Sequence, residues 1–443
     1  MSNQYLKRKV DYELIKWKND KKRKPLLLRG ARQVGKSSTV NELGKSFEFF
    51  VEVNFERDNL KHNIKEVFER GFDIKRICDE LSLIYGKPII EGRTLLFLDE
   101  IQSCIPAISS LRYFYEELPE LHVIAAGSLL EFALEDNFSF PAGRVRSLFM
   151  YPFSFEEYLR AMDLNMLADA LQNASPENPF SLSVHQTYLN HLVRFIILGG
   201  MPEVVATHVH EGSMLDCQQV LNDLMLSFYD DFSKYKERTP SSRLREIFAS
   251  VIYQTGGKFT YSAASQNANR LQIKESVELL ELAGIIHPIT HTAANGLPLA
   301  AETNDKFRKY LPLDTGIYQR FLQLDLGQLL TADSLWQVNK GALAELFVGL
   351  ELLKSAPCTN PTRLFYWQRE KKGSSAEVDY IIQRNMDIVP IEVKSGTKGS
   401  MQSMFLFLSE KNKDYGIRCS MENFGFFQNV KIYPLYAVSN IPR

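Results

Sequence analysis

The stretch that decides the fold of this chain runs from Pro25 to Ser37 and reads Pro-Leu-Leu-Leu-Arg-Gly-Ala-Arg-Gln-Val-Gly-Lys-Ser. Its first part is a short apolar run that predicts a strand. Its second part fits the pattern G-x-x-x-x-G-K-[ST], from Gly30 to Ser37. The residues after Ser37 can form a helix, so the strand–loop–helix context that this pattern requires is present. The segment therefore predicts a phosphate-binding P-loop within a parallel α/β sheet.

The residue types in this loop suit a nucleoside triphosphate. Gly30 and Gly35 allow the backbone to curve round a phosphate with its N–H groups pointing inward, and the new helix offers its positive end to the anion. Lys36 would reach the β- and γ-phosphates, and Ser37 would supply a hydroxyl to Mg²⁺. The residues expected to contact the nucleotide are Gly30, Arg32, Gln33, Val34, Gly35, Lys36, Ser37 and Ser38.

A pair of acids follows a second apolar strand, Thr94–Leu98. Asp99 and Glu100 would lie at the carboxyl end of this strand, which is the edge where ligands bind in open α/β sheets. We expect Asp99 to hold Mg²⁺, directly or through water, and Glu100 to act as the base or to orient water. Taken alone, the loop is compatible with a Gly-rich turn and the acid pair with a helix N-cap. Their order and spacing together favour nucleotide binding and hydrolysis.

Two further candidates follow the predicted strand His122–Ala126. Ser128 would touch the γ-phosphate or the attacking water, although capping of the next helix is an equally good interpretation. Arg144 or Arg146 would act as an arginine finger, either within the chain or from a neighbouring subunit of a homo-oligomer. The alternative for both arginines is a surface salt bridge.

The composition is that of a globular protein without a strong net charge. Of 443 residues, 45% are hydrophobic and 24% charged, and the net charge is −1. These values exclude a disordered chain and a globally basic nucleic-acid binder. Residues 1–24 are locally basic, which favours a solvated amphipathic helix and leaves a phosphate-backbone contact surface as the alternative.

The cysteines and the apolar runs indicate a cellular compartment. The five cysteines are scattered and form no C-x-x-C pair, which predicts neither disulfides nor a zinc site. No apolar run is long enough to cross a bilayer, and the first residues lack the apolar region of a signal peptide. We therefore expect a cytoplasmic protein with no membrane partner.

Changes in periodicity divide the chain into five predicted segments. They are a basic N-terminal helix (1–24), a P-loop core (25–152), a helical extension (153–240), a winged-helix-like domain (241–322) and a smaller α/β domain (336–443). The wing is expected around Asn295-Gly296. The presumed recognition helix, Gln272–Leu282, is rich in glutamate, which would repel phosphates. A packing or oligomer role is therefore favoured over insertion into the major groove.

The last segment contains a second candidate site. Two predicted strands, Glu377–Gln383 and Ile388–Lys394, form a hairpin, and period-two alternation puts Glu392 and Lys394 on the same face. Asp379 would lie on the neighbouring strand. We expect these three residues to converge on one exposed face.

This pattern resembles the PD-(D/E)xK nuclease signature, with Glu345 on the preceding helix as the upstream acid. Val378 stands where the full motif has proline. In such a site Asp379 and Glu392 would bind Mg²⁺, while Lys394 would help to activate water or stabilise charge. The alternatives are a charged exposed hairpin, or a nuclease fold that has kept its shape and lost its activity.

Several motifs together resemble the prokaryotic AAA-type ATPase family, in the branch whose members carry an uncharacterised C-terminal domain. They are Gly30–Ser37, Leu95–Gln102, Ala126–Leu129, Gly143-Arg144, Tyr151–Tyr158, Gly199–Glu203 and Leu313–Ile317. The resemblance covers nearly the whole chain. It implies an AAA-like strand order and ATP as the nucleotide, and implies little about cellular role.

The expected fold class is therefore multidomain α/β: an AAA-like P-loop parallel sheet, a helical extension, a winged helix and a restriction-endonuclease-like α/β domain. Three functional hypotheses follow. The first is an ATPase that couples its nucleotide state to DNA or RNA through the C-terminal domains. The second is an ATP-dependent switch or assembly protein with a protein partner. The third is an ATP-regulated, metal-dependent nuclease.

Overall fold

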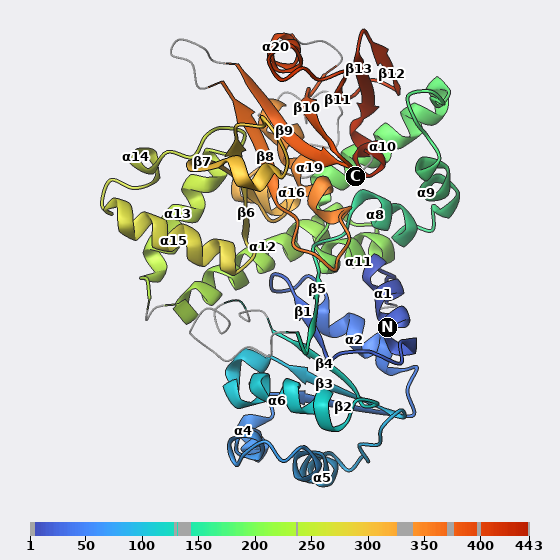
Figure 1. The fold of residues 1–443 in the computed structure, drawn as a ribbon, viewed down its shortest axis with the longest axis vertical. Helices are drawn as coiled ribbons and strands as arrows, with labels where there is room; N and C mark the ends of the chain where they lie inside the picture. The colour runs from blue at the N-terminus through green and yellow to red at the C-terminus, as the bar shows by residue number, and fades with distance from the viewer. Residues whose placement is uncertain are drawn as a thin grey trace. The chain divides into compact units, whose positions relative to one another are not determined.

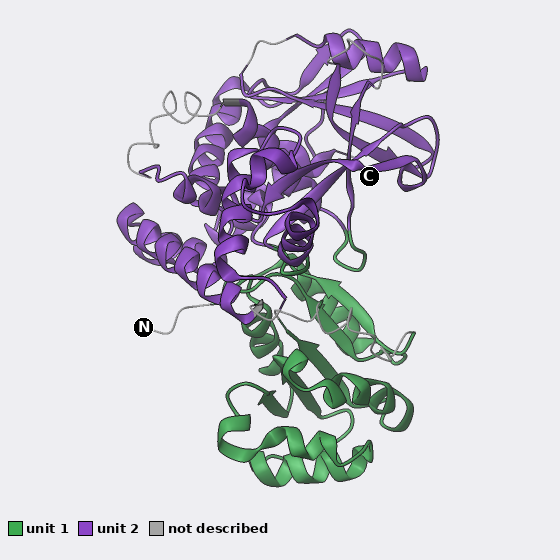
Figure 2. Ribbon diagram, turned by 90° about the vertical axis from the view of Figure 1, so that its left-hand side faces the viewer, with its two compact units in different colours: residues 1–151, 282–284, 357–361 green, residues 152–281, 285–356, 362–443 purple. Residues whose placement is uncertain are grey.

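A computed structural model of the chain describes residues 5–127, 131, 143–235, 238–325, 340–369, 376–396 and 400–441 (Figure 1). The chain divides into two compact units (Figure 2). Unit 1 consists of residues 1–151, 282–284 and 357–361, and unit 2 consists of residues 152–281, 285–356 and 362–443.

Unit 1 is built on a five-stranded sheet in which every described pair of neighbours is parallel. The order is β2 (Phe49–Asn54), β3 (Thr94–Asp99), β4 (His122–Ala126), β1 (Leu26–Arg29) and β5 (Arg146–Phe149). The central strands read as continuous apolar runs because both of their faces are buried. The predicted parallel α/β sheet is confirmed, with the strands expected before Gly30, at Thr94–Leu98 and at His122–Ala126.

The helices of unit 1 follow local sequence signals. They are α1 (Lys9–Asn19), α2 (Lys36–Gly44), α3 (Asn59–His62), α4 (Ile64–Glu69), α5 (Ile74–Tyr85) and α6 (Ile105–Glu117), with a short 3₁₀ turn at Ile101–Ser103. In α5, the Asp73 side chain accepts a hydrogen bond from the Arg76 amide and caps the helix. The buried residues Ile74, Ile77 and Leu81 then recur at helical spacing, which packs one face of α5 into the core.

The basic N-terminal helix α1 is amphipathic, as predicted. Its buried residues Val10, Leu14 and Trp17 lie on one face, and the Trp17 indole donates a hydrogen bond to the Lys24 carbonyl at 2.7 Å. The His122 ring contacts the Lys18 carbonyl at 3.0 Å and lies against the Trp17 ring. The apolar face of α1 is therefore part of the unit 1 core.

Unit 2 combines helices with an eight-stranded mixed sheet. Its helices are α8 (Phe155–Ala161), α9 (Asn165–Gln172), α10 (Leu182–Leu198), α11 (Pro202–Glu211), α12 (Met214–Asp231), α13 (Ser241–Tyr253), α14 (Tyr261–Ala264), α15 (Arg270–Leu282), α16 (Thr315–Phe321), α19 (Lys340–Lys354) and α20 (Gln402–Lys411). The strand order is β12 (Gly425–Phe427), β13 (Val430–Pro434), β11 (Gly416–Ser420), β10 (Asp387–Val393), β9 (Glu377–Arg384), β8 (Leu364–Gln368), β6 (Ile286–Thr292) and β7 (Thr303–Pro312).

The hairpin expected as the wing of a winged helix belongs to this sheet. Strand β6 pairs antiparallel with β7 and parallel with β8, with Ile289 opposite Leu364. Segments 241–322 and 336–443 thus share one sheet, and the wing does not stand apart from the last segment. Between α13 and α15 the chain forms only one helical turn, α14. A winged helix is therefore not confirmed.

Two family-like motifs of the sequence meet at a buried aspartate. The Asp314 carboxylate caps α16 by accepting hydrogen bonds from the Gly316 and Ile317 amides, and it also accepts one from the Gly200 amide at 2.6 Å. A Cβ at Gly200 would lie 2.2 Å from the Phe153 carbonyl oxygen, which only glycine avoids. The segments Gly199–Glu203 and Leu313–Ile317 thus meet in one buried contact.

His122 should make the stability of unit 1 sensitive to acid. Burial lowers the pKa of its imidazole from 6.5 to about 4, so the unfolded chain binds this proton more readily than the folded chain. The stability contribution is present above pH 6.5 and is lost as the pH falls toward 4. Between pH 7 and pH 5 the loss should be up to about 2 kcal/mol. Urea unfolding of the wild type and of His122→Asn at both pH values measures it. An equal pH dependence in both proteins would contradict the assignment.

Candidate functional site

The predicted P-loop lies between β1 and α2, and its path is set by two glycines. Gly30 has φ +143°, and a Cβ at this position would lie 2.2 Å from the Met150 carbonyl oxygen. Gly35 has φ +96° and precedes the first residue of α2. Val34 is buried, whereas Gln33 and Ser38 are exposed. The loop therefore makes the tight turn into the helix that phosphate binding requires.

Lys36, the first residue of α2, directs its amine back into the loop. It is 8% exposed, and its Nζ donates hydrogen bonds to the carbonyls of Gly30 at 2.8 Å and Ala31 at 2.7 Å. Burial lowers the pKa of this amine to about 8, and the nearby Glu100 and Asp99 carboxylates oppose the shift. A phosphate entering the loop would take over the amine from these carbonyls.

Ser37 and Asp99 are in direct contact across the site. The Ser37 hydroxyl donates to Asp99 Oδ2 at 3.0 Å, and the Asn54 side-chain Nδ2 donates to the same oxygen at 3.3 Å. Burial, followed by the Glu100 charge, raises the pKa of the Asp99 carboxyl. A hydroxyl and a carboxylate held this closely are hard oxygen donors of the kind that Mg²⁺ prefers. Asn54, at the end of β2, was not identified from the sequence.

Glu100 follows Asp99 in a strained backbone conformation. Its φ of +51° is uncommon for a residue with a side chain, and its amide donates to Asp99 Oδ1 at 3.1 Å. Its Oε2 accepts a hydrogen bond of 2.6 Å from the Gln102 side chain. The Gln102 side chain therefore orients the Glu100 carboxylate, which was predicted to act on water.

Arg8 supports the loop from outside and was missed in the sequence, where it counted only as one of the basic residues of the N-terminal segment. It is 6% exposed, and its guanidinium donates to the Val34 carbonyl at 3.1 Å and to the Tyr151 carbonyl at 2.7 Å. Beside it, the Tyr5 hydroxyl donates to Asp11 and contacts the Thr39 hydroxyl in α2. No sequence pattern signals these long-range contacts.

The other predicted ATPase residues are placed as follows. Arg144 forms an ion pair with Glu116 at 3.2 Å, and Arg146 lies 3.8 Å from Asp20. Both contacts correspond to the surface salt-bridge alternative, and a role as arginine finger stays a prediction. Arg32 is partly buried. Ser128 lies outside the described residues.

The second candidate site is a cluster of charged side chains in unit 2. Lys394 Nζ lies 2.6 Å from Glu392 Oε1, and Asp379 Oδ2 accepts a hydrogen bond of 2.7 Å from the Val393 amide. Where β9 pairs with β8 the register shifts, so that two residues, Asp379 and Tyr380, lie opposite the single residue Tyr366. This bulge accompanies the predicted grouping of Asp379, Glu392 and Lys394.

Two residues that the sequence did not indicate complete this cluster. Lys309 Nζ lies 2.8 Å from Glu345 Oε1 and 2.5 Å from Glu377 Oε1. The prediction of an exposed face was wrong for Glu392, which is only 6% exposed, whereas Asp379 and Lys394 are partly buried. Glu345 is 7% exposed. Burial raises the pKa of Glu345 and of Glu392, and the Asp379 charge adds to both shifts, while Lys309 opposes the shift of Glu345 and Lys394 opposes that of Glu392.

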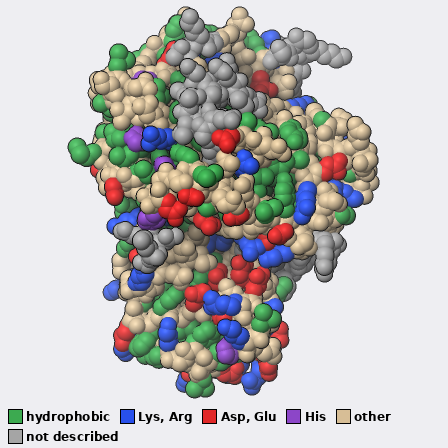
Figure 3. Space-filling model, turned by 180° about the vertical axis from the view of Figure 1, so that it is seen from behind, with side chains coloured by type: hydrophobic (Ala, Val, Ile, Leu, Met, Phe, Trp, Pro, Cys, Tyr) green, Lys and Arg blue, Asp and Glu red, His purple; other side chains and the backbone are tan. Residues whose placement is uncertain are grey.

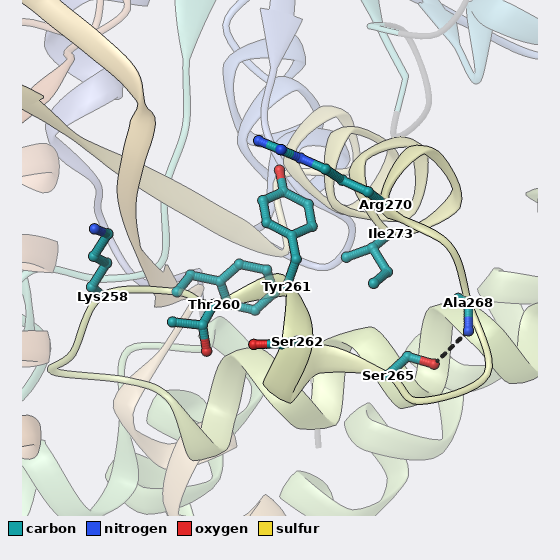
Figure 4. Close-up of a pocket in the computed structure, with 9 residues that line it drawn as sticks. Lys258, Thr260, Tyr261, Ser262, Ser265, Ala268, Arg270 and Ile273 are labelled. Carbon is teal, nitrogen blue, oxygen red and sulfur yellow. Dashed lines mark hydrogen bonds between the residues drawn. The ribbon is translucent and has the colours of Figure 1, made fainter.

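A pocket of about 450 Å³ lies where α14 meets α15 (Figure 4). Arg270 extends over the Tyr261 ring, with its guanidinium 5.6 Å from the ring centroid. Lys258 lies at the opposite end of the pocket, with its Nζ 3.6 Å from the Phe307 centroid. Hydroxyls of Thr260 and Ser262 line the wall between them. Its lining combines cations, rings and hydroxyls and contains no carboxylate.

Three further features of the described residues concern the cysteines, membrane-spanning helices and groups of metal-ligand side chains. All five cysteines are free. Within the described ranges, no helix is long and apolar enough to span a bilayer, and no group of three or more His, Cys, Asp or Glu side chains is arranged to hold a metal ion. On the face shown in Figure 3, Lys and Arg side chains are interspersed with Asp and Glu.

Solved structures similar to this chain have low identity. A Walker-type ATPase of Pyrococcus abyssi is 15% identical, with 73% of this chain and 97% of that chain covered and a TM-score of 0.45. The Aeropyrum pernix Orc1 protein in complex with DNA is 13% identical (74% and 91% covered, TM-score 0.29). Drosophila ORC bound to DNA is also 13% identical (73% and 88% covered, TM-score 0.26). No curated protein matches the chain.

Three family models match consecutive parts of the chain. Residues 189–328 match a domain of unknown function (DUF8612), and residues 340–438 match another (DUF4143). Residues 22–159 match the AAA domain, and they contain β1 to β5 and the loop that carries Lys36. This part of the chain is a P-loop ATPase domain of the AAA type.

Proposed function

We propose that unit 1 binds ATP together with Mg²⁺ and hydrolyses the γ-phosphate bond. The observation that carries this proposal is the contact between the Ser37 hydroxyl and the Asp99 carboxylate at 3.0 Å, beside the Lys36 amine and the Glu100 carboxylate. Both oxygen donors needed for Mg²⁺, the cation needed for phosphate and an acid for the water thus belong to one site.

Each residue has a separate task in this proposal. Lys36 exchanges its two loop carbonyls for phosphate oxygens, and the amides of the loop and of the α2 N-terminus bind the remaining phosphate charge. Ser37 and Asp99 hold Mg²⁺, which would neutralise charge on the phosphates. Glu100, oriented by Gln102, positions the attacking water and accepts its proton.

Changing Lys36 to Ala should weaken ATP binding by about 100-fold or more, because the charge that meets the phosphates is removed. Fluorescence titration with a labelled ATP analogue measures the affinity. Lys45→Ala is the matched control, since Lys45 lies just after α2 with its side chain 72% exposed. Circular dichroism verifies folding. Unchanged affinity in a folded Lys36→Ala protein would overturn the nucleotide site.

Changing Glu100 to Gln should leave ATP bound and lower the turnover number by roughly 100-fold or more, because only activation of water is lost. Phosphate release under saturating ATP measures turnover, and the titration above measures binding. Glu42→Gln serves as the control for loss of a carboxylate, because Glu42 belongs to α2 and its side chain is 38% exposed. If Glu100→Gln turns over at the wild-type rate, another residue acts as the base.

We propose that unit 2 binds single-stranded DNA or RNA. The supporting observation is the pocket lined by Lys258, Tyr261 and Arg270. In single-strand binders, basic side chains contact the phosphates and neighbouring aromatic rings stack on the bases. ATP hydrolysis would then be coupled to occupancy of this pocket. The glutamates of α15 do not line it.

A Lys258→Ala, Arg270→Ala double variant should bind a labelled single-stranded oligonucleotide about 10-fold more weakly than the wild type, with a shallower salt dependence. Fluorescence anisotropy measures the affinity, and the ATPase rate with and without the oligonucleotide measures coupling. Lys274→Ala is the control, because Lys274 lies on α15 and is paired with Glu278. A wild type that binds neither DNA nor RNA would favour the switch with a protein partner.

The remaining hypothesis is an ATP-regulated, metal-dependent nuclease. It requires that Glu345, Asp379 and Glu392 share a divalent ion and that Lys394 can reach the same space. The ion pair between Lys309 and Glu345 counts against that requirement, because it occupies one Glu345 oxygen.

A further inference from the structure

Lys309 is a buried cation among carboxylates that come from two different elements. It belongs to β7, and its side chain is 1% exposed. Its Nζ lies 2.8 Å from Glu345 Oε1 in α19 and 2.5 Å from Glu377 Oε1 in β9. The Tyr366 ring centroid is 5.3 Å from the same nitrogen. An ammonium group is this deeply buried only when carboxylates compensate its charge.

One of the two oxygens that bind this amine is an oxygen that a divalent ion in the predicted site would need. A metal shared by Glu345 and its neighbours would take Glu345 Oε1, which is already bound by Lys309. Glu392 Oε1 is similarly paired with Lys394 at 2.6 Å, and Asp379 Oδ2 accepts the Val393 amide. One oxygen of the cluster, Glu392 Oε2, is buried without a hydrogen-bond partner. A protein nitrogen therefore already binds one oxygen of each of the three carboxylates Glu345, Glu392 and Asp379.

We propose that Lys309 takes the place of a divalent cation in this cluster. Its ion pairs with Glu345 and Glu377 then form a fixed network that joins β7, β9 and α19, and unit 2 does not assemble a metal centre from Glu345, Asp379 and Glu392. The proposal concerns this chain's own residues and does not depend on ATP hydrolysis in unit 1. It makes unit 2 a binding module whose nuclease-like residues serve its internal structure.

The proposal predicts a gain of metal binding when Lys309 is removed. In Lys309→Gln the Glu345 and Glu377 oxygens lose their cation, and Mn²⁺ should bind at least about 10-fold more tightly than to the wild type. Electron paramagnetic resonance of free Mn²⁺ measures binding to the full-length chain. A rise in melting temperature with Mn²⁺, larger than in the wild type, provides a second readout.

Three controls separate replacement of a cation from other effects. Lys309→Arg keeps the charge and should behave as the wild type. Lys306→Gln removes an exposed lysine from the same strand and should leave Mn²⁺ binding unchanged. Lys309→Gln combined with Glu345→Gln removes both charges and should fold without the gain. Mn²⁺ binding to unit 1 is common to all variants and cancels in the comparison.

Two results would overturn the proposal. One is a folded Lys309→Gln protein that binds Mn²⁺ no better than the wild type. The other is a wild-type protein whose Mn²⁺ binding, or Mn²⁺-dependent nicking of plasmid DNA, is lost on changing Asp379 to Asn. If Lys309→Gln does not fold, the wild-type comparison with Asp379→Asn decides alone, and Mn²⁺ binding that is independent of Asp379 supports the proposal.

Discussion

The close approach of Gly30 to the Met150 carbonyl is the constraint on which the nucleotide site depends. At 2.2 Å from that oxygen there is no room for a Cβ, and the φ of +143° is one that other residues rarely adopt. The chain therefore leaves β1 along one narrow path, which turns it into α2 with Lys36 facing the loop carbonyls. Arg8 holds the other side of this turn through the Val34 and Tyr151 carbonyls. Flanking backbone thus fixes the shape of the loop.

In unit 2 the corresponding constraint is buried charge. Asp314 is compensated by three backbone amides, and Lys309 is compensated by two glutamates. Removing one partner from such a group leaves an unpaired charge in the interior, which costs more than the pair itself contributes. We therefore expect each network to tolerate few substitutions. Each network fixes which segments of the chain pack together, even where its net stabilisation is small.

The parts of the fold that could be predicted are those with local signals. The Pro25–Ser37 stretch contains its own strand, turn and helix start, and the apolar run before Asp99 identifies its own strand. Arg8, Asn54 and Lys309 carry no such signal, because each acts through contacts far away in the sequence. The hairpin of β6 and β7 was correctly expected, but its parallel pairing with β8 is non-local. No turn chemistry around Asn295 indicates which sheet the hairpin will join.

The cluster in unit 2 shows why a residue pattern alone does not determine chemistry. The alternation of Glu392 and Lys394, with Asp379 on the next strand, is what a metal-dependent nuclease requires, and it is also what an internal ion-pair network requires. The two differ in what occupies the space between the carboxylates. A metal ion needs several oxygens whose free lone pairs point at one position. A lysine amine can take that position whenever a nearby strand carries the lysine. Here β7 supplies it, through Lys309. Since β7 precedes α19 in the chain and carries no motif, the feature that decides between the two chemistries lies outside the pattern that suggested them.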